Sequence, residues 1–165
     1  MGLDSQKYTT HIIDFGLAKR YRDPQTYIHI PCRDGYPLIG TTRFASINAH
    51  LGIELSCRDD IESLAYLLIY FMHGSLPWQN DQGNKKELLV QRKKQNMPVD
   101  VICKGLPEEF GHLLKYARAL KFSERPDYDY LRKLFSNLHQ DAGEGLKCLT
   151  FHNSINFDSG RGMKR

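Results

Sequence analysis

The feature that most constrains the fold is residues 61–72, an apolar segment that contains a single charged side chain. A helix that is apolar on nearly every side is stable in water only where other elements cover it, so this segment predicts a buried central helix. Ser56 and Asp59 are candidate N-cap residues, and Gly74 with Pro77 predicts the end of the helix. The rest of the chain is therefore expected to pack around this segment.

Three further segments predict helices on the basis of their periodicity. Residues 87–94 are amphipathic, residues 107–120 start with a proline that suits the first helical position, and residues 126–138 repeat apolar side chains every three or four positions. The charged side chains around residues 85–94 indicate a solvated helix face. The fold class expected from these patterns is mainly α.

The N-terminal quarter of the chain has a different character. Residues 1–10 are polar, and residues 11–15 are rich in β-branched side chains, which predicts a short strand. Residues 17–39 contain three prolines and several charges, which predicts a long loop. Loops of this length in compact domains are usually functional, so we expect chemistry or binding near this segment.

Composition excludes several classes of function. The 165 residues are 41% hydrophobic and carry a net charge of +4, which fits one globular domain and gives no reason to expect a nucleic-acid partner. The longest apolar run, residues 64–72, is too short to cross a membrane. The four cysteines lack zinc-site spacing. They indicate a reduced intracellular compartment, cytoplasmic or nuclear, with a secreted protein as the alternative.

Two short motifs flank the long loop. Asp-Phe-Gly at residues 14–16 precedes the loop, and Gly-Thr-Thr-Arg at residues 40–43 follows it. In protein kinases the same order gives the magnesium-binding turn, the activation loop and the substrate platform. Asp-Phe-Gly alone is a weak signal, so the interpretation depends on the words that follow it.

Five later segments are informative. They are Ser-Ile-Asn at 46–48, Arg-Asp-Asp-Ile-Glu-Ser-Leu at 58–64, Gly-Ser-Leu-Pro-Trp at 74–78, Cys-Lys-Gly-Leu-Pro at 103–107 and Pro-Asp-Tyr at 126–128. Together they resemble one kinase family, casein kinase I. Most kinases end the activation segment with Ala-Pro-Glu, whereas this family has a Ser-Ile-Asn type sequence, which residues 46–48 match. The resemblance extends from residue 1 to about residue 138, and the segment after residue 140 shows little of it.

The resemblance implies the large lobe of a two-lobed Ser/Thr kinase, mainly α with a short β-hairpin at its start. Residues 1–139 would be a partial kinase domain, and residues 140–165 a divergent, flexible tail. Residues 1–3 fit the family sequence just after the catalytic loop, so the small lobe, the early helices of the large lobe and the catalytic base would be absent. A truncated gene model, an alternative start and a real fragment remain open.

The resemblance assigns roles around the Asp-Phe-Gly turn. Asp14 would bind the Mg²⁺ that neutralises the phosphates of ATP, and Ile13 would line the nucleotide pocket. Phe15 and Gly16 would be structural residues of the turn. The alternatives are an ordinary turn aspartate for Asp14 and a core strand residue for Ile13.

Gly40, Thr41 and Arg43 match the substrate platform of the family, which favours acidic or already phosphorylated protein substrates. A guanidinium binds phosphate in bidentate fashion, so Arg43 would be the recognition residue; a structural salt bridge is the alternative. Tyr36 stands where the family often has a lysine for this anion site. This departure puts a preference for phosphorylated substrates in doubt, although Lys85 and Lys86 could supply charge.

The function implied is transfer of the ATP γ-phosphate to Ser or Thr of a protein. These 165 residues contain no general base and no phosphate-binding lysine, so the chain alone is expected to be inactive. The alternative is a non-catalytic binding module. Asp60 would be a structural residue that anchors the catalytic loop. Because helices that cover the central helix would be missing, residues 64–72 are expected to be under-packed and to favour self-association.

Overall fold

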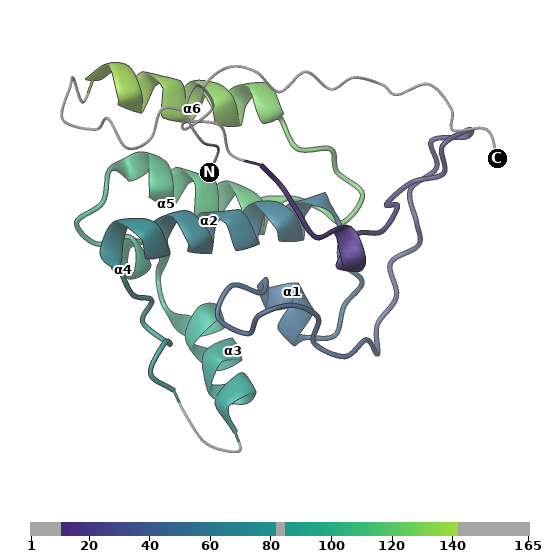
Figure 1. Cartoon of the computed structure of the whole chain (residues 1–165), viewed down its shortest axis with the longest axis horizontal. Helices are drawn as coiled ribbons and strands as arrows, with labels where there is room; N and C mark the ends of the chain where they lie inside the picture. The colour runs from purple at the N-terminus through teal and green to yellow at the C-terminus, as the bar shows by residue number, and fades with distance from the viewer. Residues whose placement is uncertain (1–10, 82–84, 142–165) are drawn as a thin grey trace. The chain divides into compact units, whose positions relative to one another are not determined.

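The computed structural model describes residues 11–81 and 85–141, and these residues form six α-helices and no β-strand (Figure 1). The mainly α fold class is therefore confirmed. The helices are α1 (Ile47–His50), α2 (Cys57–His73), α3 (Lys86–Asn96), α4 (Val99–Ile102), α5 (Glu108–Ala119) and α6 (Tyr128–Asp141). A 3-10 helix, η2, covers Phe15–Leu17. No helix in this part of the chain has the length and apolarity to span a bilayer.

The chain divides into two units, which are described separately. The helical unit is Lys19–Leu138, and the terminal unit is Met1–Ala18 together with His139–Arg165. All the α-helices lie in the helical unit, apart from the last residues of α6. Residues 1–10, 82–84 and 142–165 lie outside the described part, so the expected tail is almost wholly untested.

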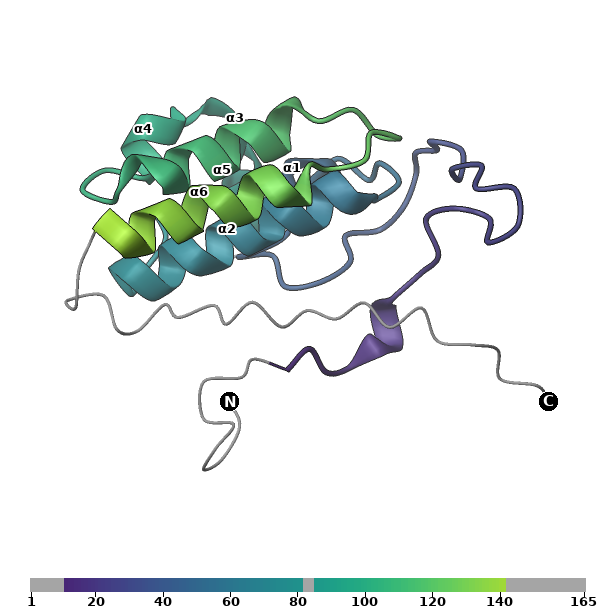
Figure 2. The same ribbon diagram turned by 90° about the horizontal axis from the view of Figure 1, so that it is seen from above.

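Helix α2 is the centre of the helical unit, and α5 packs along it (Figures 1 and 2). Tyr66 and Ile69 on α2 and Leu114 on α5 are fully buried. Burying such side chains contributes about 1.5–3 kcal/mol each, which makes this helix pair the main source of stability. The prediction of a central helix at residues 61–72 is confirmed.

One side of α2 is only partly covered. Leu64 is 42% exposed, Phe71 66% and Met72 39%. The expected under-packing of residues 64–72 is present at these three positions. Self-association through them stays a prediction.

The ends of α2 follow the expected signals. Ser56 is the N-cap residue, and its backbone N–H donates to the Asp59 carboxylate at 2.8 Å. Gly74 is the C-cap residue with φ of +73°, a backbone conformation that glycine adopts without strain. The Gly74 N–H donates to the Tyr70 carbonyl at 2.8 Å, which closes the last turn.

The other three predicted helices are also present, as α3, α5 and α6, with ends shifted by a few residues. Figure 2 shows α6 lying beside α5, where Phe110 and Phe135 meet edge to face with ring centroids 5.5 Å apart. The helices α1 and α4 were not expected from the sequence. Each has four residues, too few to show a helical period.

The strand predicted at residues 11–15 is wrong. Residues 11–14 have no regular structure, and Phe15 begins η2. Ile12 and Ile13 are about four-fifths exposed, at 80% and 79%. A strand needs a partner for its backbone groups, and no described residue supplies one here. The other half of the expected hairpin lies in residues 1–10, outside the described part.

The long loop is confirmed, because residues 18–39 contain no helix or strand. A single bridge joins Arg22 and His29, and Asp23 caps the turn between them by accepting from Gln25 and Thr26 backbone N–H groups at 2.9 and 2.7 Å. These two hydrogen bonds are the main cause of a lowered pKa for the Asp23 carboxyl.

Candidate functional site

The Asp-Phe-Gly turn lies in the terminal unit. Asp14 has φ of +62° and ψ of +76°, a left-handed conformation that is uncommon for a residue other than glycine. Its carboxylate caps η2 by accepting from the Gly16 N–H at 3.2 Å, and the residue is exposed. Aspartate adopts this conformation more readily than most residues, and Tyr27 in the loop has a similar φ of +58°, so the conformation alone does not mark a functional site. Ile13 and Phe15 are also exposed, at 79% and 70%, so neither is a core residue here.

Asp14 alone does not make a metal site. Among residues 11–81 and 85–141, no three His, Cys, Asp or Glu side chains gather as a metal ion would require. Asp14 can offer one carboxylate to a Mg²⁺·ATP complex, but Mg²⁺ needs near-octahedral oxygen ligation. The described residues therefore do not complete a site for this cofactor, and no phosphoryl-transfer step follows from them.

The platform motif forms a compact turn in the helical unit. Gly40 has φ of +91°, which suits glycine, and the Thr41 carbonyl accepts from the N–H groups of Phe44 and Ala45 at 2.8 and 3.0 Å. Ser46 then caps α1 by accepting from the Ala49 N–H at 3.1 Å. Gly40, Thr41 and Arg43 thus belong to one continuous turn that leads into α1.

Three backbone carbonyls of this turn are bound by side chains from distant parts of the helical unit. Lys94 Nζ donates to the carbonyls of Thr42 and Ala45 at 2.9 and 2.6 Å. The indole Nε1–H of Trp78 donates to the carbonyl of Arg43 at 2.8 Å. The backbone on both sides of Arg43 is therefore fixed from the interior.

The Arg43 side chain is half-buried and stacks on aromatic rings. Its guanidinium carbon lies 5.3 Å from the centroid of the Tyr70 ring and 5.7 Å from that of Phe44. No ion pair or side-chain hydrogen bond joins Arg43 to any residue that the structure describes. The structural salt bridge considered as its alternative role is not found there. Its hydrogen-bond donors are available to an anion.

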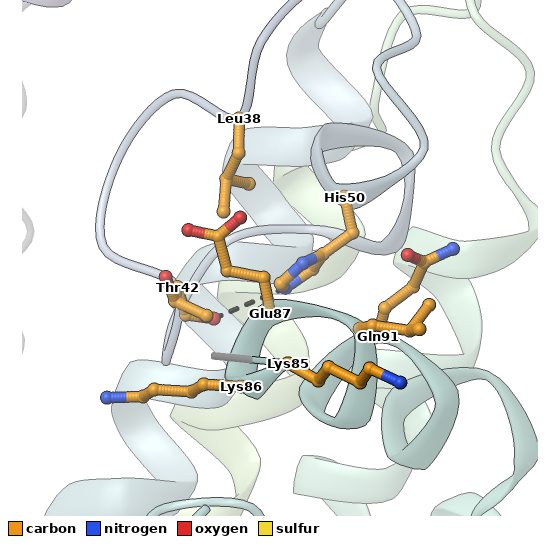
Figure 3. A pocket seen from close by; sticks show the side chains of 8 residues that line it. Leu38, Thr42, His50, Lys85, Lys86, Glu87 and Gln91 are labelled. Atoms are coloured by element: carbon orange, nitrogen blue, oxygen red, sulfur yellow. Dashed lines mark hydrogen bonds between the residues drawn. The ribbon is translucent and has the colours of Figure 1, made fainter. Parts of the chain in front are cut away.

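A groove of about 820 Å³ lies between the loop, α1 and the start of α3 (Figure 3). Leu38 and Thr42 of the loop, His50 of α1 and the first residues of α3 line it. Lys85, Lys86 and Glu87 are exposed at the start of α3. Figure 3 shows the Glu87 side chain directed toward Leu38 and the two lysine side chains directed away from it, so the charges along the groove are of both signs.

The loop is tied to the segment after α1 by backbone hydrogen bonds. The Tyr36 N–H donates to the Gly52 carbonyl at 3.0 Å, and the Glu54 N–H donates to the Arg33 carbonyl at 2.8 Å. A Cβ atom on Gly52 would lie 2.7 Å from the Tyr36 carbonyl oxygen, so only glycine fits. Tyr36, which replaces the expected lysine, therefore lies at a close backbone contact.

A network of buried polar side chains holds the backbone of Lys94 and the start of α1. Tyr66 donates to Glu62 at 2.6 Å, and Arg118 Nη2 donates to Tyr66 and to the Lys94 carbonyl, both at 2.9 Å. Glu62 also accepts from the Ile47 N–H at the start of α1, at 3.3 Å. Burial raises the pKa of Glu62, and the Tyr66 hydrogen bond and Arg118 oppose this shift. The network joins α1, α2, α3 and α5.

Asp60, the expected anchor, is exposed in the first turn of α2, and its anchoring role stays a prediction. The buried carboxylate of this turn is its neighbour Asp59. Asp59 accepts from Ser46 Oγ at 2.7 Å and from Asn48 Nδ2 at 2.9 Å, besides the backbone of Ser56. It therefore joins the start of α1 to the start of α2.

The roles of Lys94 and Trp78 at the turn were not predicted from the sequence, and Asp59 was predicted only as a candidate N-cap residue. Lys94 was hidden in a run of charges that indicated a solvated face. The available signal was helical spacing: Val90 and Lys94 are four residues apart on α3, and both are buried. A charged residue that shares the apolar stripe of a helix is expected to have an internal partner.

His50 is expected to stay neutral over the physiological pH range. Burial, with a smaller contribution from the positive charge of Lys94, lowers its pKa from 6.5 to about 4. Between these two values the unfolded chain binds a proton that the folded chain does not, so the His50 contribution makes the free energy of unfolding fall as pH decreases from 6.5 to about 4.

An NMR titration of the His50 ring should therefore show a midpoint near pH 4. H50Q retains an oxygen that can accept from Lys94, and it should remove this part of the pH dependence of stability. A midpoint near 6.5 in the folded protein would contradict the expectation.

No protein-family model matches this chain. The site and fold define a mainly α-helical protein with a cationic turn held rigidly from its interior, and the function is argued from that site.

Proposed function

We propose that this chain is the substrate-binding part of a casein kinase I type Ser/Thr protein kinase, and that its platform turn binds acidic or phosphorylated protein segments. The observation that supports this most is Arg43. Its backbone carbonyl is bound by Trp78, its guanidinium stacks on Tyr70 and Phe44, and no described carboxylate pairs with it.

This arrangement suits anion recognition for a physical reason. An unpaired guanidinium on aromatic faces keeps its edge donors for a ligand, and a fixed backbone reduces the entropy lost on binding. Carboxylate and phosphate oxygens match the fork geometry of the guanidinium. The neighbouring groove is lined by Lys85 and Lys86 and also by Glu87, so its charges are mixed. A peptide segment that presents a carboxylate or phosphate to Arg43 is the ligand that fits these features.

The kinase part of the proposal rests on the order of motifs and on the central helix. An Asp-Phe-Gly turn, a long loop, a Gly-Thr platform and a central helix follow one another as the family resemblance implies. The 165 residues contain neither a His-Arg-Asp loop nor a Gly-rich nucleotide loop. We therefore propose that this chain binds a protein substrate. Transfer of the γ-phosphate from ATP is proposed only for a protein that also supplies those two loops, and we propose that such a protein acts inside the cell.

The test is calorimetric binding of an acidic peptide that carries phosphoserine. R43A should weaken binding about ten- to hundredfold, because a bidentate bond to a charged group is lost. R43K should recover only part of the loss, since an ammonium is a point charge without the planar fork.

The matched control is R92A, which removes the same charge from an exposed position on α3. It should leave the affinity almost unchanged. If R43A and R92A bind the peptide like the unmodified chain, the platform is not the binding site and the proposal fails. Binding of ATP·Mg²⁺ by the chain would support its origin from a kinase and would argue against a non-catalytic binding module.

A further inference from the structure

Lys94 is an unusual residue for a helix that mostly faces solvent. It is 0% exposed, although lysine is among the side chains that are least often buried without a partner. Its neighbour Lys93 keeps a side chain that is 40% exposed and pairs with Asp81 at 2.6 Å. The contrast between these two adjacent lysines indicates a specific role for the buried one.

The Lys94 ammonium has an acceptor for each of its three donors. These are the carbonyl oxygens of Thr42 at 2.9 Å and Ala45 at 2.6 Å, and His50 Nε2 at 3.2 Å. Two aromatic faces complete the enclosure, with the nitrogen 4.9 Å from the Tyr66 ring and 5.2 Å from the Trp78 ring.

The contacts also assign the tautomer of His50. Its Nε2 lies 3.3 Å from the Thr42 carbonyl, the contact drawn in Figure 3, and 3.2 Å from Lys94 Nζ. One ring nitrogen cannot donate to the carbonyl and accept from the ammonium together. Lys94 reaches the Thr42 carbonyl at the shorter distance of 2.9 Å, so Nε2 accepts and the His50 proton lies on Nδ1.

Several elements that pack against α3 contribute groups around Lys94. The titratable or charged groups are His50 of α1, Glu62 and Tyr66 of α2, and Arg118 of α5. The two loops contribute the Thr42 carbonyl and the Trp78 ring. Burial lowers the pKa of Lys94 to about 7; the charge of Glu62 opposes this shift, and that of Arg118 adds to it. Lys94 is thus mostly protonated at pH 6. In that form it has three N–H donors, one for each of its three acceptors.

We propose that Lys94 is the positioning residue of the platform: its enclosed ammonium fixes the carbonyls of Thr42 and Ala45, and thereby the direction of the Arg43 guanidinium. The inference that Lys94 affects anion binding rests on the proposed function of Arg43. The geometric part concerns Arg43 and the Tyr70 ring alone and can be tested without a ligand.

The test compares K94M with K93M at pH 6. Methionine keeps much of the length and volume of lysine but donates no hydrogen bond, and K93M changes the adjacent, half-exposed lysine. In the unmodified chain, the Arg43 side-chain protons should carry ring-current shifts from Tyr70 and Phe44. K94M should move these resonances to the values of an unstacked arginine with helical content retained, and K93M should leave them in place.

The same pair of variants is then measured with the phosphoserine peptide. K94M should bind about tenfold more weakly than the unmodified chain, because Arg43 is no longer held in its binding direction. A folded K94M that keeps both the Arg43 ring-current shifts and the original affinity would overturn the inference. If R43A itself does not weaken peptide binding, the proposed function fails, while the ring-current result still decides the role of Lys94.

If K94M does not fold, the unmodified chain gives the answer through ¹⁵N NMR of its lysine ammonium groups. At pH 6, the Lys94 protons should exchange with water at least about tenfold more slowly than those of Lys93, because three acceptors hold them. Equal exchange rates for the two lysines would show that the ammonium is not enclosed, and this would overturn the inference.

Discussion

Replacing Trp78 with alanine is expected to lower the free energy of unfolding by about 3–5 kcal/mol, the usual range for a large aromatic side chain lost from a core. Trp78 is 1% exposed, and its ring meets Tyr66 edge to face at 5.1 Å. It also supplies the hydrogen bond to the Arg43 carbonyl and one face of the enclosure around Lys94. The substitution therefore opens a cavity and also leaves the Arg43 carbonyl without its indole donor.

The matched control is Trp78→Phe, which keeps an aromatic ring but removes the indole N–H. It should cost about 1–3 kcal/mol, since the main losses are one hydrogen bond and part of the packing. Trp78 is the only tryptophan, so unfolding is followed by circular dichroism in urea rather than by fluorescence. A W78A protein as stable as the unmodified chain would show that the segment after α2 does not pack as described.

The second large effect is expected at Asp59. D59A should lower the free energy of unfolding by about 3 kcal/mol, because three donors lose a charged acceptor in a buried place. These donors are Ser46 Oγ, Asn48 Nδ2 and the Ser56 N–H, at 2.7–2.9 Å from the carboxylate. The loss would loosen the start of α1 and the start of α2 together.

The adjacent residue provides the control. D60A removes an exposed carboxylate from the same helical turn and should change the free energy of unfolding by no more than about 0.5 kcal/mol. Denaturant titrations of both variants give the comparison directly. Equal losses for D59A and D60A, or a larger loss for D60A, would mean that the buried acceptor of this turn has been misassigned.

The four longer helices could be predicted because each is long enough to display a helical period, and the end of α2 was also marked by Gly74. The failures have a common physical cause. The strand at residues 11–15 depended on a partner that local sequence cannot specify, and α1 and α4 are stabilised by their surroundings rather than by their own four residues.

The exposed residues of the turn could be predicted from the sequence, but the interior residues that hold the turn could not. Arg43 and Gly40 stood out because a loop motif is contiguous in sequence. Lys94 and Trp78 did not, because they reach the turn from 49 and 35 residues away, and no local pattern records such a contact. Asp59 and Asp60 are adjacent carboxylates, and only the packing of α1 distinguishes them.

Those sequence separations have a consequence for the order of folding. The contacts that fix the turn close chain segments of 35, 49 and 52 residues, those between Trp78 and Arg43, Lys94 and Ala45, and Lys94 and Thr42. Contacts of such long range form only after the entropy of closing the intervening chain has been offset by other interactions. The contact between Arg118 of α5 and Tyr66 of α2 also closes 52 residues. We therefore expect Arg43 to reach its stacked position together with the packing of α2 against α5, after the individual helices have formed.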